Sequence, residues 1–361
     1  MPKVSVIVPI YGVEKYIERC ARSLFEQTLD DIEYLFIDDC TPDRSIEILQ
    51  KVLEEYPQRK PQVTIHRMEQ NSGQAAVRKW GMQNATGEYV IHCDSDDWVD
   101  TDMYRAMYEK AKENDADMVL CDFVLTDGVY YQNHRGGLDG SKTEYFYKLF
   151  TDFSIAPWNL VIRLVKNSII KEHDIIYPQN NMGEDMALAV QMVYYSNEIE
   201  YIPRGYYYYF QNNTSITNQT SHRKIEELTN QWAENVRILD CFFAKEHVSD
   251  IDEYIIRLKY ISRNNLLPII KENGYHKMWK SLFSEIHKRI IRSNVLTVNE
   301  KIKYYLIYYK QWRILDYFGV TKNKILKQKF TPPPGEKSNR KVEVAVSEHQ
   351  IKELQKEKYK Y

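Results

Sequence analysis

The stretch VSVIVPIYGVEKYIERCARSLFEQT (residues 4–28) sets the pattern for the first third of the chain. It begins with a short, β-branched apolar run at 4–8, which is typical of a strand buried on both faces. Apolar residues then recur at helical spacing from 13 to 25. A buried strand followed directly by an amphipathic helix is the repeating unit of an α/β fold.

The alternation of strand and helix signals continues to about residue 121. Strands are expected at 4–8, 33–37, 63–66, 88–93 and 118–121. Helices are expected at 13–25, 41–56, 72–84 and 100–114, with Thr41 and Ser72 as N-caps. Strands and helices of these lengths predict a mostly parallel sheet with helices on both faces.

Beyond residue 125 the signals predict a different organisation. A helix is expected at 182–196 and a strand at 206–210, and the signals from 221 to 330 are helical. The run TPPPG (331–335) ends the helical region, and Ser347 and Gln350 have capping-box spacing in the tail. We therefore expect an α/β domain at 1–220, a Tyr-rich helical region at 221–330, and a Pro-rich linker with a short helical or disordered tail at 331–361.

Composition limits the class of protein. The chain has 361 residues, of which 43% are hydrophobic and 28% are charged, as in soluble globular proteins. No run approaches the roughly 18 apolar residues of a transmembrane helix, and the N-terminus lacks the layout of a signal peptide. Five scattered cysteines without CxxC spacing indicate a reducing cytosol and argue against structural zinc.

Charge is distributed unevenly along the chain. Residues 276–330 hold 13 Lys/Arg and 3 Asp/Glu, although the net charge of the whole chain is −2. Such a basic section suggests contact with something anionic.

Polar residues follow three of the expected strands. They are Pro9-Ile10-Tyr11, Asp38-Asp39 and Asp94-Ser95-Asp96-Asp97. Ligands of parallel sheets bind outside the carboxyl ends of the strands, so these clusters should converge on one site. No GxGxxG and no GxxxxGK[ST] occurs, which disfavours a nicotinamide enzyme and a P-loop NTPase.

The stretch HCDSDDW (92–98) places three carboxylates within four positions, directly after a buried strand. One interpretation is a solvated turn in which Asp97 or Asp100 caps the next helix. The other is a divalent cation held by a carboxylate, with phosphate oxygens as further ligands. The neighbouring clusters favour the cation, which would neutralise the crowded charges.

VSVIVPIYGVEKYIERCARSLFEQT, YLFIDDCTPD and NSGQAAVRKWGMQNATGEYVIHCDSDD together resemble the family 2 glycosyltransferases of GT-A fold, of the bacterial cell-surface polysaccharide type. The likeness runs from Val4 to about Phe123 and resumes at APWN (156–159), GED (183–185) and SIT (215–217). It implies transfer of a sugar from a nucleotide-diphosphate donor with inversion at the anomeric carbon.

For the donor, the resemblance implies that Pro9 and Tyr11 line the nucleobase pocket and that Asp39 hydrogen-bonds the base, typically uracil. Arg78 would lie near the diphosphate, where a guanidinium suits phosphate; the alternative is a surface helix arginine. Cys40 departs from the family pattern, which has glycine after the aspartate pair.

Asp94-Ser95-Asp96 matches the DxD motif of the family. Asp96 is then the expected ligand of Mn²⁺ or Mg²⁺, and Asp94 contacts ribose or the metal. For Asp97 a helix cap remains the better explanation.

The GED sequence matches the ED motif of the family, whose aspartate is the usual general base. Asp185 is therefore the expected base, with Glu184 as the fallback. Acidic residues are also favoured at a helix start by the dipole, which would keep Asp185 ionised.

Trp158 and Asn159 match acceptor-side positions, although a buried tryptophan is an equal alternative. The usual WNKLY is WNLVI here, so acceptor specificity cannot be inherited. The absence of QxxRW suggests that one sugar is added per binding event.

For the basic section at 276–330, one interpretation is contact with an anionic membrane surface, which suits a lipid-linked acceptor. The alternative is a solvated helical subdomain; nucleic acid is disfavoured because no recognised motif accompanies the charge. We expect a cytoplasmic protein, peripheral on the inner face of the plasma membrane if the first interpretation holds. A homo-oligomer stays open.

Two other functions compete with an active transferase. A catalytically inactive homologue could bind nucleotide-sugar or act as a membrane scaffold, but the chain retains Asp94, Asp96 and Asp185 together. A nucleotidyltransferase would normally need a basic, glycine-rich loop near its N-terminus, which VPIYGVEKY does not provide.

Overall fold

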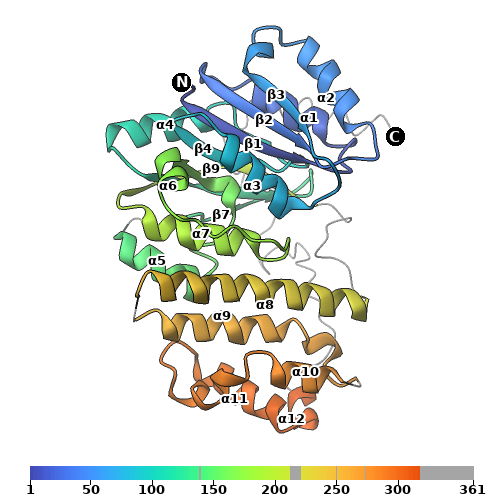
Figure 1. Ribbon diagram of the computed structural model, residues 1–361, viewed down its shortest axis with the longest axis vertical. Coiled ribbons are helices and arrows are strands. Elements are labelled where there is room, and N and C mark those ends of the chain that lie inside the picture. The colour runs from blue at the N-terminus through green and yellow to red at the C-terminus, as the bar shows by residue number, and fades with distance from the viewer. Residues whose placement is uncertain (138–139, 212–220, 249, 273, 318–361) are drawn as a thin grey trace, which may run out of the picture.

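A computed structural model describes residues 1–137, 140–211, 221–248, 250–272 and 274–317. Figure 1 shows a stack of layers, with the sheet at one end of the molecule and helices at the other. The described strands all come from the first 210 residues.

One nine-stranded sheet is formed by the described residues. Its strands are β1 (Val4–Ile10), β2 (Ile32–Asp38), β3 (Val63–Arg67), β4 (Tyr89–His92), β5 (Trp98–Val99), β6 (Met118–Thr126), β7 (Tyr131–His134), β8 (Arg163–Lys166) and β9 (Ile199–Phe210). They follow the order β3-β2-β1-β4-β8-β6-β9-β5, with β7 paired to β6. The five strands expected before residue 122 are all present, and β9 contains the expected strand at 206–210.

The sheet is mostly parallel, as predicted. β1, β2, β3 and β4 are joined by parallel pairs, and so are β6 and β9. β8 is antiparallel to both β4 and β6, so six strands run in one direction. The remaining strands β5, β7 and β8 are short.

Helices cover both faces of the sheet, again as predicted. The helices of this part are α1 (Ile17–Phe25), α2 (Ser45–Glu54), α3 (Gln74–Asn84), α4 (Met103–Glu113), α5 (Lys142–Thr151), α6 (Asn167–Lys171) and α7 (Glu184–Tyr195). Alternate side chains of β1 point to opposite faces. Val6 and Val8 share one apolar cluster with α1, α2 and α4, whereas Ile7 shares another with α3, α5, α6 and α7.

Two predicted helix caps are wrong. α2 begins at Ser45, and the Thr41 hydroxyl instead accepts the Gly12 N–H at 2.8 Å. α3 begins at Gln74 after Gly73, and the Ser72 side chain does not cap it. The Thr41 side chain thus connects the loops after β1 and β2, and the backbone N–H of Ser72 connects the loop after β3 to Asp39.

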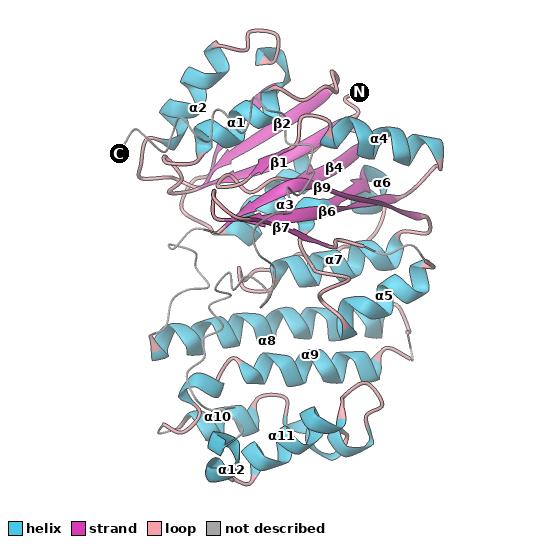
Figure 2. Cartoon of the chain, turned by 180° about the vertical axis from the view of Figure 1, so that it is seen from behind, coloured by secondary structure: helices cyan, strands magenta, loops and turns pink. Residues whose placement is uncertain are grey.

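The helical region continues the stack below α7. Its helices are α8 (His222–Lys245), α9 (Asp252–Asn264), α10 (Tyr275–Ser281), α11 (Val298–Tyr308) and α12 (Trp312–Tyr317). Figure 2 shows α8 and α9 side by side, with α10, α11 and α12 beyond them. One apolar cluster extends from Ile7 in the sheet to Leu315 in α12, so the layers are packed against one another.

No helix among the described residues has the length and apolar character needed to cross a membrane. The SIT sequence (215–217) of the family resemblance, the helical signals at 318–330 and the tail at 331–361 lie outside the described residues. The expected domain boundaries stay predictions.

Candidate active site

The polar clusters after β1, β2 and β4 meet at one edge of the sheet, as predicted. Ile10 at the end of β1 lies beside Asp38 of β2, and His92 at the end of β4 lies beside Ile7 of β1. Pro9 is half-buried there, and Tyr11 is 52% exposed at the rim. The strands therefore bring the expected donor-site residues together.

Asp39 is buried and binds the backbone before α3. Its two carboxylate oxygens accept the Ser72 and Gly73 N–H groups at 2.7 and 2.8 Å. Asp38, also buried, accepts the Thr41 N–H at 2.7 Å. The aspartate pair thus fixes two loops at the mouth of the site, and each Asp39 oxygen keeps a second lone pair for a ligand.

Cys40 keeps the backbone conformation that favours glycine. Its φ is 57°, in the left-handed region, where a side chain costs roughly 1–2 kcal/mol. Its thiol donates to the Met68 carbonyl at 3.0 Å. The departure from the family pattern therefore leaves the turn in place.

The expectation that Asp97 caps a helix is wrong. Asp97 is buried and accepts the Tyr207 hydroxyl at 2.6 Å and the Phe210 N–H at 2.7 Å, both from β9. Burial, reinforced by the charges of Asp96 and Asp94, raises its pKa well above the ordinary range. This carboxyl group holds the turn onto β9 and does not face a ligand.

Asp94 and Asp96 differ from Asp97 because both are partly exposed. Asp94 Oδ1 accepts the Arg78 guanidinium at 2.8 Å and the Gln74 amide at 3.3 Å. The Asp96 carbonyl accepts Arg19 at 2.9 Å, and Ser95 between them is buried. The first and third residues of the DxD motif are thus presented at the site by a firmly held backbone.

Arg78 is the central residue of the site and is only 3% exposed. Its Nη1 donates to Glu184 and its Nη2 to Asp94, both at 2.8 Å. Burial alone would lower its pKa, but the charges of Asp94, Glu184 and Asp185 raise it overall. The surface-helix interpretation is wrong, and the guanidinium joins the DxD turn to the start of α7.

Glu184 and Asp185 begin α7 after Gly183, whose φ is 84°. Burial raises the pKa of Glu184 to about 8, against the lowering effect of Arg78 and with a further increase from Asp185. Burial also raises the pKa of Asp185, which Arg78 and the Met186 N–H oppose. The net direction for Asp185 is opposite to that expected from the helix dipole.

The segment around Trp158 and Asn159, the WN loop, is held by its own neighbours. The Trp158 indole donates to the Leu149 carbonyl at 2.9 Å, and its ring lies 4.2 Å from that of Phe153. Trp158 and Asn159 are each half-buried. Arg163, which sequence reasoning missed, is fully buried and donates to the carbonyls of Pro157 and Asn159.

The residues at the site fit a divalent cation of the kind expected. Within the part of the chain that the structure describes, no three His, Cys, Asp or Glu side chains are grouped as a metal site. Mg²⁺ is usually held by one or two carboxylates and completed by substrate phosphates and water. Asp94 and Asp96 match that incomplete protein ligand set.

Residues 5–174, a little under half of the chain, match the model of Glycosyl transferase family 2. It is 29% identical over 224 residues to the uncharacterized glycosyltransferase EpsJ of Bacillus subtilis, covering 60% of this chain and 63% of EpsJ. The chain thus spans less than two thirds of that relative.

Two solved structures share the fold. S. aureus TarS 1-349 in complex with UDP-GlcNAc aligns with a TM-score of 0.55 at 17% identity, over 86% of this chain and 92% of that one. The mannosyltransferase PcManGT from Pyrobaculum calidifontis, in complex with GDP-Man and Mn²⁺, aligns with a TM-score of 0.50 at 14% identity, over 91% and 88%. The α/β architecture followed by helices is therefore that of GT-A-like glycosyltransferases.

The pKa of Glu184 predicts a pH-dependent stability. Between its ordinary pKa of 4.5 and about 8, the folded state keeps a proton that the unfolded chain has lost. The free energy of unfolding should therefore fall as pH rises through this window, by at most about 1.4 kcal/mol per pH unit from this group. Glu184→Gln should flatten that slope in denaturant unfolding curves at pH 5, 6, 7 and 8.

The exposed Glu172→Gln is the matched control and should keep the wild-type slope. If the free energy of unfolding depends on pH equally in wild type and Glu184→Gln, the Glu184 carboxyl group does not bind its proton more tightly in the folded than in the unfolded chain.

Proposed function

We propose that this chain is a metal-dependent, inverting glycosyltransferase. It moves a sugar from a nucleotide-diphosphate donor, a UDP-sugar, to a hydroxyl of a glycan or lipid-linked acceptor in cell-surface polysaccharide synthesis, one sugar per binding event. The observation that carries the proposal is the buried Arg78, which brings Asp94 of the DxD motif and Glu184 of the ED motif into one cluster.

The donor would lie along the edge formed by β1, β2 and β4. Pro9, Tyr11 and Asp39 would hold the uracil, and Asp94 would contact ribose or metal. The complex of TarS with UDP-GlcNAc supports a nucleotide-sugar donor on this fold. The family model covers these residues.

Asp96 and Asp94 would hold Mn²⁺ or Mg²⁺ against the donor diphosphate. A cation there supplies Lewis-acid stabilisation of the negative charge that develops on the departing nucleoside diphosphate. The Mn²⁺ complex of PcManGT supports this choice of cofactor. Arg19 donates to the Asp96 carbonyl, and its guanidinium lies 3.8 Å from the centre of the Trp98 ring. These two contacts would keep the turn from moving during turnover.

Asp185 would take the proton from the acceptor hydroxyl. A base works best when its pKa lies near the operating pH, and burial raises the pKa of Asp185 above that of an ordinary aspartate. Glu184 is held by Arg78 and is less suited to the role. Direct attack of the activated hydroxyl on the anomeric carbon is a single displacement, and it inverts that centre.

Asp185→Asn should reduce the transfer rate by about 10²–10⁴-fold, because a general base contributes that much. Donor binding should change by less than about threefold, since the amide keeps the shape of the side chain. Transfer of radiolabelled sugar to a lipid extract and calorimetric UDP titration measure the two quantities. In wild type, kcat should fall on the acid side as Asp185 takes up a proton.

The exposed Asp30→Asn serves as the control and should match wild type. An Asp185→Asn enzyme with a transfer rate within threefold of wild type would remove Asp185 from the proposed reaction.

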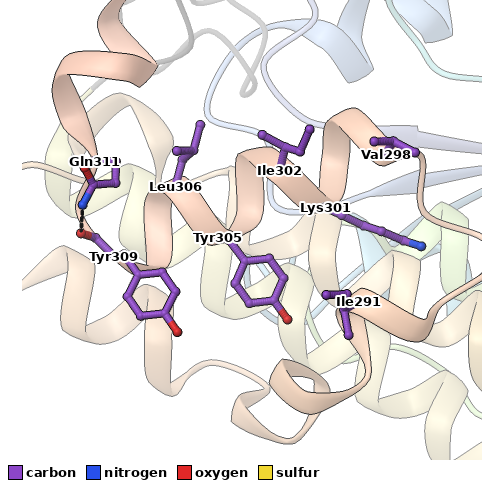
Figure 3. A pocket seen from close by; sticks show the side chains of 8 residues that line it. All are labelled: Ile291, Val298, Lys301, Ile302, Tyr305, Leu306, Tyr309 and Gln311. Atoms are coloured by element: carbon purple, nitrogen blue, oxygen red, sulfur yellow. Dashed lines mark hydrogen bonds between the residues drawn. The ribbon is translucent and has the colours of Figure 1, made fainter.

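The described end of the helical region supports contact with an anionic membrane surface. A groove of about 430 Å³ lies there, and Figure 3 shows the side chains that line it. It is lined by Ile291, Val298, Lys301, Ile302, Tyr305, Leu306, Tyr309 and Gln311. Val298, Ile302 and Tyr309 are 70%, 53% and 62% exposed and line the same groove. A contiguous exposed apolar patch of this kind is typical of an interaction surface.

The stretch of chain that carries the groove is basic, which suits anionic headgroups. Residues 276–317 contain nine Lys/Arg and three Asp/Glu. Each of the three carboxylates pairs with a basic residue from outside this stretch, as the bonds Glu285–Lys259, Glu300–Arg257 and Asp316–Lys271 show. We propose that this surface rests on the inner face of the plasma membrane and gives the site access to a lipid-linked acceptor.

Lys301→Glu/Lys310→Glu should weaken cosedimentation with phosphatidylglycerol-containing vesicles by at least ~30-fold. Each basic residue near an anionic surface contributes about 1 kcal/mol, and two such losses correspond to that factor. Raising the salt concentration should weaken wild-type binding as well.

Lys51→Glu/Lys60→Glu is the control, because it changes the net charge by the same amount. Lys51 lies in α2 and Lys60 shortly after it, at the other end of the molecule, so this variant should bind vesicles as wild type does. Equal loss in both double variants, or no vesicle binding by wild type, would contradict the membrane surface.

A further inference from the structure

The loop before α7 is held by side chains of α8, although α8 lies outside the residues that match the family model. Asn235 of α8 is fully buried, and its amide donates to the carbonyls of Asn180 and Met182, both at 3.0 Å. An amide nitrogen has two hydrogens, so both are used. Rotating the amide would turn its oxygen toward two carbonyl oxygens, so only this orientation is favourable.

Two neighbours of Asn235 on the same helix turn hold the rest of the loop. Gln231 Oε1 accepts the Met182 N–H at 3.2 Å. The Trp232 ring closes on Gly183, where a β-carbon would lie only 3.0 Å from the ring. Trp232 also lies 5.4 Å, between ring centroids, from Trp158 of the WN loop.

The held loop connects both halves of the site. Asn181, between the two carbonyls that Asn235 binds, accepts the Ala75 N–H at 3.0 Å. Ala75 is in the first turn of α3, the helix that carries Arg78. At its other end the loop leads into Glu184 and Asp185. A displacement of residues 180–183 would therefore move the candidate base relative to the donor side.

We propose that Asn235 is a positioning residue for the reaction: through the carbonyls of Asn180 and Met182 it sets the place of Asp185 at the start of α7. This inference rests on the proposed function, because it takes Asp185 as the base. It also assigns the helical region a part in the chemistry that is separate from any contact with a membrane.

Asn235→Asp tests the proposal with little change in shape. The carboxylate has no hydrogen to donate and would repel both carbonyls, so the loop should shift. We expect kcat for transfer to fall at least 30-fold with the donor KM within threefold. The acid limb of the kcat–pH profile should also move, because the surroundings of Asp185 change.

Asn230→Asp is the matched control, since Asn230 is exposed on the same helix and the change in charge is identical. It should retain wild-type kcat, KM and pH profile. Gln231→Ala removes the acceptor for the Met182 N–H, together with an exposed hydrogen bond to Glu227 on the same helix. It should lower kcat about 3–10-fold at unchanged donor KM. If Asn235→Asp does not fold, Gln231→Ala is the variant that tests the proposed positioning.

Three results would overturn the proposal. A folded Asn235→Asp enzyme with wild-type kcat and pH profile would show that the loop does not depend on Asn235. Equal losses in kcat and donor affinity, in proportion to a lower Tm, would show a structural role only. If Asn235→Asp does not fold, wild-type kcat in Gln231→Ala would overturn it. A fully active Asp185→Asn enzyme would instead show that Asp185 is not the base. This variant therefore distinguishes failure of the proposed function from failure of the positioning role of Asn235.

Discussion

The rest of the site depends on the ion pairs that the buried guanidinium of Arg78 makes. A buried charge persists only when it is paired, and removal of one partner typically costs about 3–5 kcal/mol. Arg78 is paired twice, with Asp94 after β4 and with Glu184 at the start of α7. The position of α3 in the fold is thereby tied to both acidic motifs, which lie about 90 residues apart in the sequence.

One cation facing three carboxylates leaves the cluster rich in negative charge. Burial raises the pKa values of Glu184 and Asp185, and this excess of negative charge adds to the increase. The three carboxylates of HCDSDDW (92–98) are accommodated in different ways. Burial raises the pKa of Asp97, and β9 supplies hydrogen bonds to both of its oxygens. Asp94 is paired with Arg78, and Arg19 holds the backbone of Asp96. Asp94 and Asp96, which are partly exposed, can then bind a ligand.

The sequence predicts the fold and the edge of the sheet well, because strand periodicity is local and parallel strands end together. It fails where a polar side chain is bound across a long separation. Asp97 accepts a hydrogen bond from Tyr207, 110 residues away, and Thr41 accepts one from Gly12 rather than from its own helix. Short-range cap rules cannot detect such partners. Asn235 and Arg163 were missed for the same reason, since each looks like an ordinary polar residue within its element.

Calorimetric titration of UDP, with GDP as the control nucleotide, tests most directly whether this cluster is a nucleotide-sugar site. It should be run with and without Mn²⁺ on wild type and Asp96→Ala. We expect Mn²⁺-dependent binding of UDP to wild type that is lost in Asp96→Ala. If neither nucleotide binds wild type in the presence of Mn²⁺, the carboxylates after β4 do not form a donor site.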